Sequence, residues 1–92
     1  MDTTISRNIA RKFVLINALA KMEKPSLQDL CRTTQISQPT IKRQMSTLRN
    51  EFAMKILFVR ELTGKAGTTG YYMLMDWGIF DRSSFLTRYG EL

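Results

Sequence analysis

The feature that most constrains the fold is a link of about four residues, Thr34–Ser37, between two segments with helical patterns. The first segment opens with Ser26 and Asp29, whose spacing of three is typical of a capping box at a helix N-terminus. A link this short forces the two helices to cross steeply, so that the second one projects outward. Ile36, within the link, is expected to lie buried beneath this corner.

The helix after the link is predicted to have one apolar and one polar side. Ser37 is its predicted N-cap, and Pro39 stands in the first turn, where a proline costs no hydrogen bond. Spacings of four, three and four predict that its buried residues are Ile41, Met45, Leu48 and Phe52. The opposite side has no apolar stripe and only positive charge, and it carries Thr40, Arg43 and Thr47, with Gln38, Lys42, Gln44 and Ser46 nearby.

The segment 4–22 is predicted to form another amphipathic helix. Apolar residues recur there every three or four positions, which predicts a buried stripe of Ile5, Ile9, Phe13, Ile16, Leu19 and Ala20. The basic residues off this stripe are expected in solvent or near a partner, and they are Arg7, Arg11, Lys12 and Lys21. Pro25 is predicted to end this helix, because the residue before a proline avoids the helical backbone conformation.

Beyond Met54 the spacing of apolar residues changes from the pattern of a helix to that of a strand. Two short runs rich in strand-forming residues, 56–59 and 71–75, flank the glycine-rich segment 63–70, which predicts a hairpin. The glycines lack the ending of a phosphate-binding P-loop, and no helix follows them, so nucleotide binding is not expected. Asp81 or Ser83 is predicted to begin a short last helix that Gly90 ends. The whole pattern predicts one α+β domain over residues 1–92.

The run from Ser26 to Leu48, SLQDLCRTTQISQPTIKRQMSTL, resembles the winged helix-turn-helix of bacterial transcription regulators. The resemblance extends over about residues 5–77 and implies a three-helix core, a C-terminal β-hairpin wing and a short final helix. It implies a helix-turn-helix at 26–53, a wing at 54–76 and a C-terminal helix at 81–90. It further implies a bacterial or phage-type regulator that binds double-stranded DNA, with the third helix in the major groove. In related domains the wing tip follows the backbone or minor groove, which implies that role for Lys65, with Thr63, Thr68 and Thr69.

The charge of the chain agrees with a polyanionic partner. Fourteen basic and eight acidic residues give a net charge of +6, which attracts nucleic acid or an anionic membrane. Residues 38–70 carry a net charge of +4, whereas residues 71–92 carry −1. No apolar run approaches the roughly 20 residues of a membrane span. The basic and apolar residues of the first helix are also not segregated strongly enough for binding to a membrane surface, so DNA is the expected partner and no membrane is.

Histidine is absent and Cys31 is the single cysteine. A serine–histidine triad, a histidine-ligated metal and a thiolate zinc site are therefore excluded, and no enzyme activity, metal or cofactor is expected. A lone cysteine also fits a reducing cytoplasm, because it forms no disulfide within the chain. Cys31 itself is expected to be a small core residue.

The third helix supplies most of the candidate DNA-binding residues. An arginine such as Arg43 suits guanine, a glutamine suits adenine, and a threonine suits a phosphate or a thymine methyl group. The free N–H groups at the start of the helix can bind a phosphate. The predicted DNA-binding residues are Ser37, Gln38, Pro39, Thr40, Lys42, Arg43, Gln44, Thr47, Lys65 and Thr68.

Simpler interpretations compete with this one. The basic residues could be ordinary surface residues, and Pro39 and Thr40 could serve only to start the helix. Tyr71 and Tyr72 could stack on bases, or one could pack in the core while the other lies at the surface.

The alternative function is a winged-helix protein-interaction module without sequence-specific DNA binding. The polar face of the third helix argues against it, because protein-binding faces carry aromatic or aliphatic anchors. A homodimer through the first and last helices is also expected, with no small-molecule effector evident. The predicted dimer surface includes Ile79, Phe80, Phe85, Leu86 and Tyr89.

Overall fold

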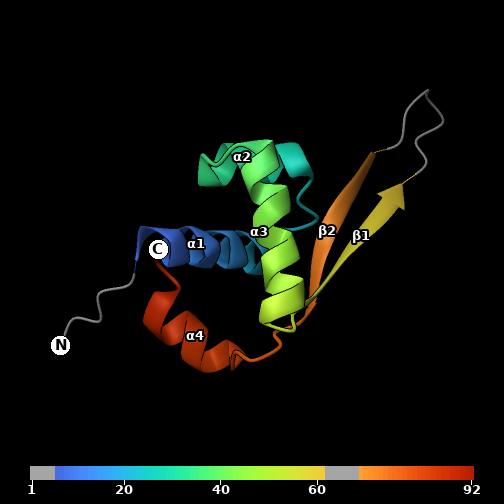
Figure 1. Ribbon diagram of the computed structural model, residues 1–92. Helices are drawn as coiled ribbons and strands as arrows, with labels where there is room; N and C mark the ends of the chain where they lie inside the picture. Colours follow the sequence, from blue (N-terminus) through green and yellow to red (C-terminus); the bar gives the residue numbers. More distant parts are fainter. Residues whose placement is uncertain (1–5, 62–68) are drawn as a thin grey trace.

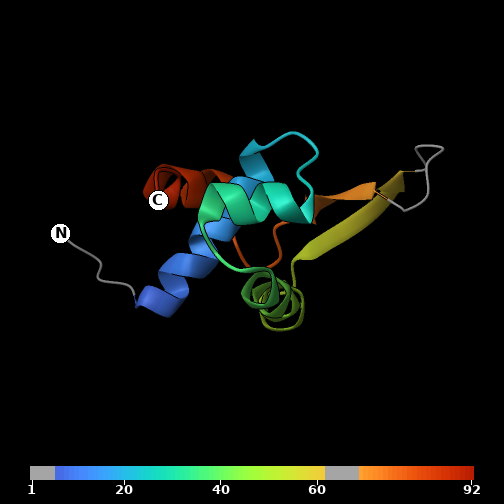
Figure 2. The ribbon, with the colours of Figure 1, turned by 90° about the horizontal axis from the view of Figure 1, so that it is seen from above.

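The computed structural model describes residues 6–61 and 69–92, which form four α-helices and one antiparallel two-stranded hairpin (Figure 1). In chain order the elements are α1 (Arg7–Lys21), α2 (Leu27–Thr34), α3 (Gln38–Glu51), β1 (Lys55–Glu61), β2 (Thr69–Asp76) and α4 (Arg82–Tyr89). The predicted α+β class is therefore confirmed. The helices gather on one side and the hairpin extends away from them, as the view from above also shows (Figure 2).

The corner between α2 and α3 forms as the sequence predicts. The Oγ atom of Ser26 accepts from the backbone N–H of Asp29 at 3.1 Å, and Asp29 Oδ2 accepts from the N–H of Ser26 at 3.0 Å. Gln35 ends α2 in the left-handed conformation, with φ 62°. Ile36 is buried beneath the turn, and its N–H donates to Thr34 Oγ1. This closure leaves only three residues between the end of α2 and the start of α3.

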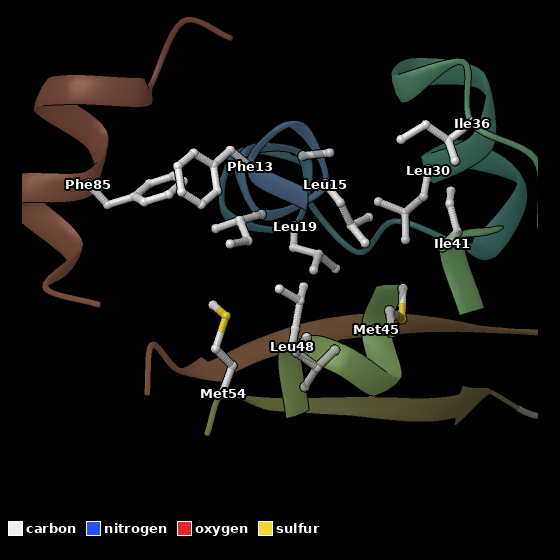
Figure 3. Packing of buried hydrophobic residues seen from close by; sticks show 13 residues of the cluster. Phe13, Leu15, Leu19, Leu30, Ile36, Ile41, Met45, Leu48, Met54 and Phe85 are labelled. Carbon is white, nitrogen blue, oxygen red and sulfur yellow. The ribbon is translucent and has the colours of Figure 1, made fainter. Parts of the chain in front are cut away.

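The core lies where α1, α2 and α3 meet, and it is completed by residues from β1 and α4 (Figure 3). Its buried apolar members are Phe13, Leu15, Ile16, Ala18, Leu19, Leu30, Ile36, Ile41, Met45, Leu48, Met54, Ile56 and Phe85. The predicted buried side of α3 is confirmed, except that Phe52 is only partly buried. Full burial of one such large side chain contributes about 1.5–3 kcal/mol, so the position of α3 is strongly determined.

The last helix, α4, packs on α1 through aromatic rings and two polar contacts. The ring of Phe13 lies 5.0 Å from that of Phe85 and 4.7 Å from that of Tyr89, measured between centroids. Asn17 Nδ2 donates to the carbonyl oxygen of Tyr89 at 2.7 Å, and Lys21 Nζ donates to that of Gly90. These donors satisfy carbonyl groups that the end of a helix leaves unpaired. Asp81 begins α4, as predicted, and its side chain accepts from the N–H of Ser84.

This packing occupies most of the surface that was predicted to hold a second copy. Phe85 is buried, and three further residues of that surface, Phe80, Leu86 and Tyr89, are partly buried against the core. Ile79 is 66% exposed. The homodimer stays a prediction, and Phe85 is not available to it because the ring fills the core of its own chain.

The hairpin is anchored to the helices at two points. Within the hairpin, Ile56 of β1 lies opposite Leu74 of β2. At the first anchor point, the backbone N–H of Tyr72 donates to the carbonyl oxygen of Pro25 at 2.9 Å. The guanidinium of Arg49 donates to the carbonyl oxygen of Ile56 from Nε at 3.1 Å and from Nη2 at 2.9 Å. This arginine therefore fixes the start of the hairpin relative to α3.

Gly78 allows the chain to pass close to the end of α3 on its way to α4. Its φ is +61°, and a Cβ atom at this position would lie 2.0 Å from the carbonyl oxygen of Phe52. The next residue, Ile79, donates its N–H to the same oxygen at 2.9 Å. Both the conformation and the lack of space thus require glycine.

Replacement of Gly78 with alanine is expected to lower the free energy of unfolding by more than about 1 kcal/mol. For a domain of this size the loss corresponds to a melting temperature lower by at least about 4 °C. Thermal unfolding followed by circular dichroism measures the change. Ser83→Ala, at an exposed position of α4, is the control and should change stability by less than about 0.5 kcal/mol. Equal melting temperatures for the two variants would contradict this account.

The capping box predicts a pH-dependent contribution to stability. The backbone N–H of Ser26 and, secondarily, its side chain hold the pKa of Asp29 below its ordinary value of 3.8. A carboxyl group whose pKa is lowered in the folded state stabilises that state above pH 3.8, and this contribution is lost as the pH falls through the lowered pKa.

The difference in unfolding free energy between wild type and Asp29→Asn should therefore shrink as the pH decreases below 3.8, because asparagine does not titrate. Urea unfolding over a pH series measures this difference. Gln28→Ala, an exposed substitution in the same turn, should keep the pH dependence of wild type. A wild-type advantage over Asp29→Asn that stays constant into strong acid would count against the role given to this carboxylate.

Candidate nucleic-acid interface

The start of α3 presents polar groups at an exposed helix end. Ser37 is the N-cap residue, as predicted, but its side chain makes no capping bond to the backbone and instead donates to Thr40 Oγ1 at 3.0 Å. Pro39 lies in the first turn and has no N–H to satisfy. The remaining N–H groups of this turn thus lack a side-chain cap. Together with the helix dipole they favour an anion at this end.

The outward face of α3 carries cations and neutral polar groups. Gln38, Lys42 and Arg43 are exposed, and Thr40 and Thr47 are partly exposed. Arg43 Nη2 donates to Thr40 Oγ1 at 3.5 Å. A guanidinium has five N–H donors, so this contact occupies only a part of its bonding capacity. No acidic residue occurs between the start of α3 and Asn50.

An open cavity of about 360 Å³ separates this face of α3 from the first half of α1. The lining residues from α3 follow the first of them by three, four and seven positions, and those from α1 follow theirs by three and four. Each wall of the cavity is therefore one stripe along a helix. The lining residues are Thr40, Arg43, Gln44 and Thr47 from α3, and Asn8, Arg11 and Lys12 from α1. Figure 1 shows that α3 runs across the direction of α1.

The α1 wall corrects one expectation from the sequence. Lys12, expected in solvent or near a partner, is buried within its own chain at 8% exposed, and its Nζ donates to Asn8 Oδ1 at 2.9 Å. Arg11 is exposed beside it. Sequence reasoning did not include these α1 residues in the candidate site. Their spacing on one face of the helix was the signal available, but only the crossing of α1 and α3 reveals which element that face meets.

Gln44 was expected on the exposed side of α3, and this expectation is wrong. The side chain is 5% exposed, and its Oε1 atom has no hydrogen-bond partner among the described residues. Gln44 is near the boundary between the apolar and polar sides of the helix, and α1 covers it there. Of the α3 residues proposed to bind DNA, Thr40, Arg43, Gln44 and Thr47 line the cavity, whereas Ser37, Gln38, Pro39 and Lys42 lie outside it.

Two predicted DNA-binding residues of the hairpin, Lys65 and Thr68, lie outside the described residues. The same holds for Thr63. The described part of the hairpin carries Arg60, which is exposed near the end of β1.

Comparison of the chain with protein-family models, with curated proteins and with solved structures finds no match in any of the three. Within residues 6–61 and 69–92, none of the helices has the length and apolar character needed to cross a bilayer.

Proposed function

We propose that the chain is a winged helix-turn-helix domain that binds double-stranded DNA in the cytoplasm as a transcription regulator, with α3 in the major groove. The order of α2, a three-residue turn, α3 and a hairpin supports this proposal. The capping box of α2 and the buried Ile36 support it as well, because they give the steep crossing on which such domains rely. The hairpin would act as the wing.

The observation that carries the proposal is the chemistry of the outward face of α3. A major groove about 12 Å wide admits one α-helix, whose side chains must offer hydrogen bonds to bases and charge to phosphates. The first three turns of α3 offer exposed amide, hydroxyl, ammonium and guanidinium groups and no carboxylate. A carboxylate there would be repelled by the backbone of the duplex.

Each side chain then has a role set by its donors. Arg43 can bond a guanine through two parallel N–H donors, and Gln38 can bond an adenine through its amide. Lys42 and the free N–H groups of the first turn suit phosphates. Gln44 is too deeply buried to reach a base without a rearrangement of α1 or α3, so it has no role in base contact in this proposal.

A protein-interaction module is the second candidate, and one observation favours it. The hairpin exposes large apolar side chains along β1 and β2, namely Leu57, Phe58, Met73 and Met75. Leu57 and Met73 are paired across the strands, so their side chains lie side by side on one face. Exposed apolar groups of this kind are typical of surfaces that contact other proteins.

Arg43→Ala is expected to weaken binding to a duplex that wild type selects from a random library by about 5–150-fold, as loss of a bidentate base contact does. Wild-type affinity itself should fall steeply with salt, because phosphate contacts release counterions. Fluorescence anisotropy over a salt series measures both quantities.

Arg82→Ala, which removes an exposed arginine from α4, is the matched control and should retain wild-type affinity and selectivity. Failure of wild type to bind any duplex at low salt would reject DNA binding and favour the protein-interaction module. Equal losses for the two variants would show instead that only overall charge matters.

A further inference from the structure

The cavity between α1 and α3 has the dimensions and lining of a ligand site. Its volume of about 360 Å³ lies within the range of about 300–1,000 Å³ that is typical of small-ligand sites. Three of its seven lining residues, Arg11, Lys12 and Arg43, are cations, and none of those seven is acidic. Three positive charges without a carboxylate in the lining favour an anion in this cavity.

Lys12 is the strongest indication of an anionic ligand. Its side chain is 8% exposed, yet the partner that the structure gives its ammonium group is the neutral amide oxygen of Asn8. Burial of a charged group is costly unless an opposite charge and hydrogen bonds compensate for the lost hydration. An anion in the cavity would supply both, and it would also reduce the repulsion between Lys12 and the two arginines.

Gln44 adds a neutral polar group to the cavity lining. Its side chain is 5% exposed and lines the cavity. Its Oε1 atom is enclosed and has no partner among the described residues. The amide also carries the Nε2 donor, which suits an oxygen of a ligand.

We propose that this cavity is a phosphate-binding site, in which Arg11 and Lys12 bind and neutralise the group while Gln44 and Thr40 donate to its oxygens. The positive charge of Arg43 adds to the attraction. Phosphate presents several acceptor oxygens around one negative centre, and arginine binds that geometry through paired donors. The source of the phosphate can be the backbone of a duplex or a free phosphate ester. Assignment to the DNA backbone rests on the proposed function, whereas the phosphate site itself does not.

The DNA source follows from the position of Arg43. This residue belongs both to the outward face of α3 and to the cavity. A duplex whose major groove receives α3 would therefore bring one strand of its backbone toward α1. In that arrangement α1 contributes a sequence-independent contact that fixes the register of α3, as phosphate contacts do in protein–DNA complexes.

Arg11→Gln tests the DNA source, with Arg7→Gln as the matched control because Arg7 is also an exposed α1 residue but does not line the cavity. The slope of log affinity against log salt should decrease in magnitude by about 1 for Arg11→Gln and remain unchanged for the control. Affinity should fall by a similar factor for selected and unrelated duplexes. Circular dichroism verifies that both variants fold.

Inorganic phosphate tests the site without DNA. In heteronuclear NMR spectra of wild type, the side-chain amide signals of Gln44 and Asn8 should shift saturably with phosphate and not with chloride at equal ionic strength. Lys12→Met should weaken this response at least tenfold, while Arg7→Gln preserves it.

The outcomes separate the two proposals. Saturable phosphate binding without duplex binding would keep the site, assign it a free phosphate ester and reject the proposed function. Saturable phosphate binding with a salt slope that Arg11→Gln leaves unchanged would also assign a free ester, with DNA binding retained. Duplex binding by wild type, an unchanged slope in Arg11→Gln and no saturable phosphate response would overturn the phosphate site alone.

Discussion

The position of α3 depends on the apolar contact beneath the turn that precedes it. Leu30, Ile36 and Ile41 come from α2, the turn and α3, and they are buried together against α1 (Figure 3). Truncation of a buried leucine or isoleucine costs about 2–5 kcal/mol, which is comparable with the whole stability of a small domain. Because this contact occupies one side of α3, the polar side is left facing outward and toward the first half of α1.

The helix α1 connects the core with α4 at one end and with the proposed site at the other. Its apolar side fills the core, and Asn17 and Lys21 hold the C-terminal end of α4 through backbone carbonyl groups. Its first half turns a polar stripe toward α3 and forms one wall of the cavity. The same rigid packing that stabilises the domain therefore also holds the cationic side chains together, despite their mutual repulsion. This arrangement is the physical reason to expect an anion between the two helices.

Local signals in the sequence predicted most of the fold. The capping box at Ser26, the start of α4 and the buried stripe of α3 depend on neighbours within a few residues. The capping box is confirmed, Asp81 is the one of two predicted residues that begins α4, and the stripe is confirmed apart from the partly buried Phe52. The burial of Lys12 and Gln44 was missed, because it arises only where α1 and α3 cross, and periodicity within one helix does not show which element covers it. The contact of Asn17 with Tyr89 joins residues 72 positions apart and gives no local sequence signal.

The central claim is that the outward face of α3, together with the start of α1, contacts the duplex. Mapping of backbone amide chemical-shift changes on the whole chain, during titration with a short duplex, tests this claim most directly. The account predicts the largest changes from Ser37 to Thr47 and around Arg11, with little change in α4. Changes concentrated on α4 and on the apolar face of the hairpin around Leu57 and Met73, with α3 unaffected, would contradict it.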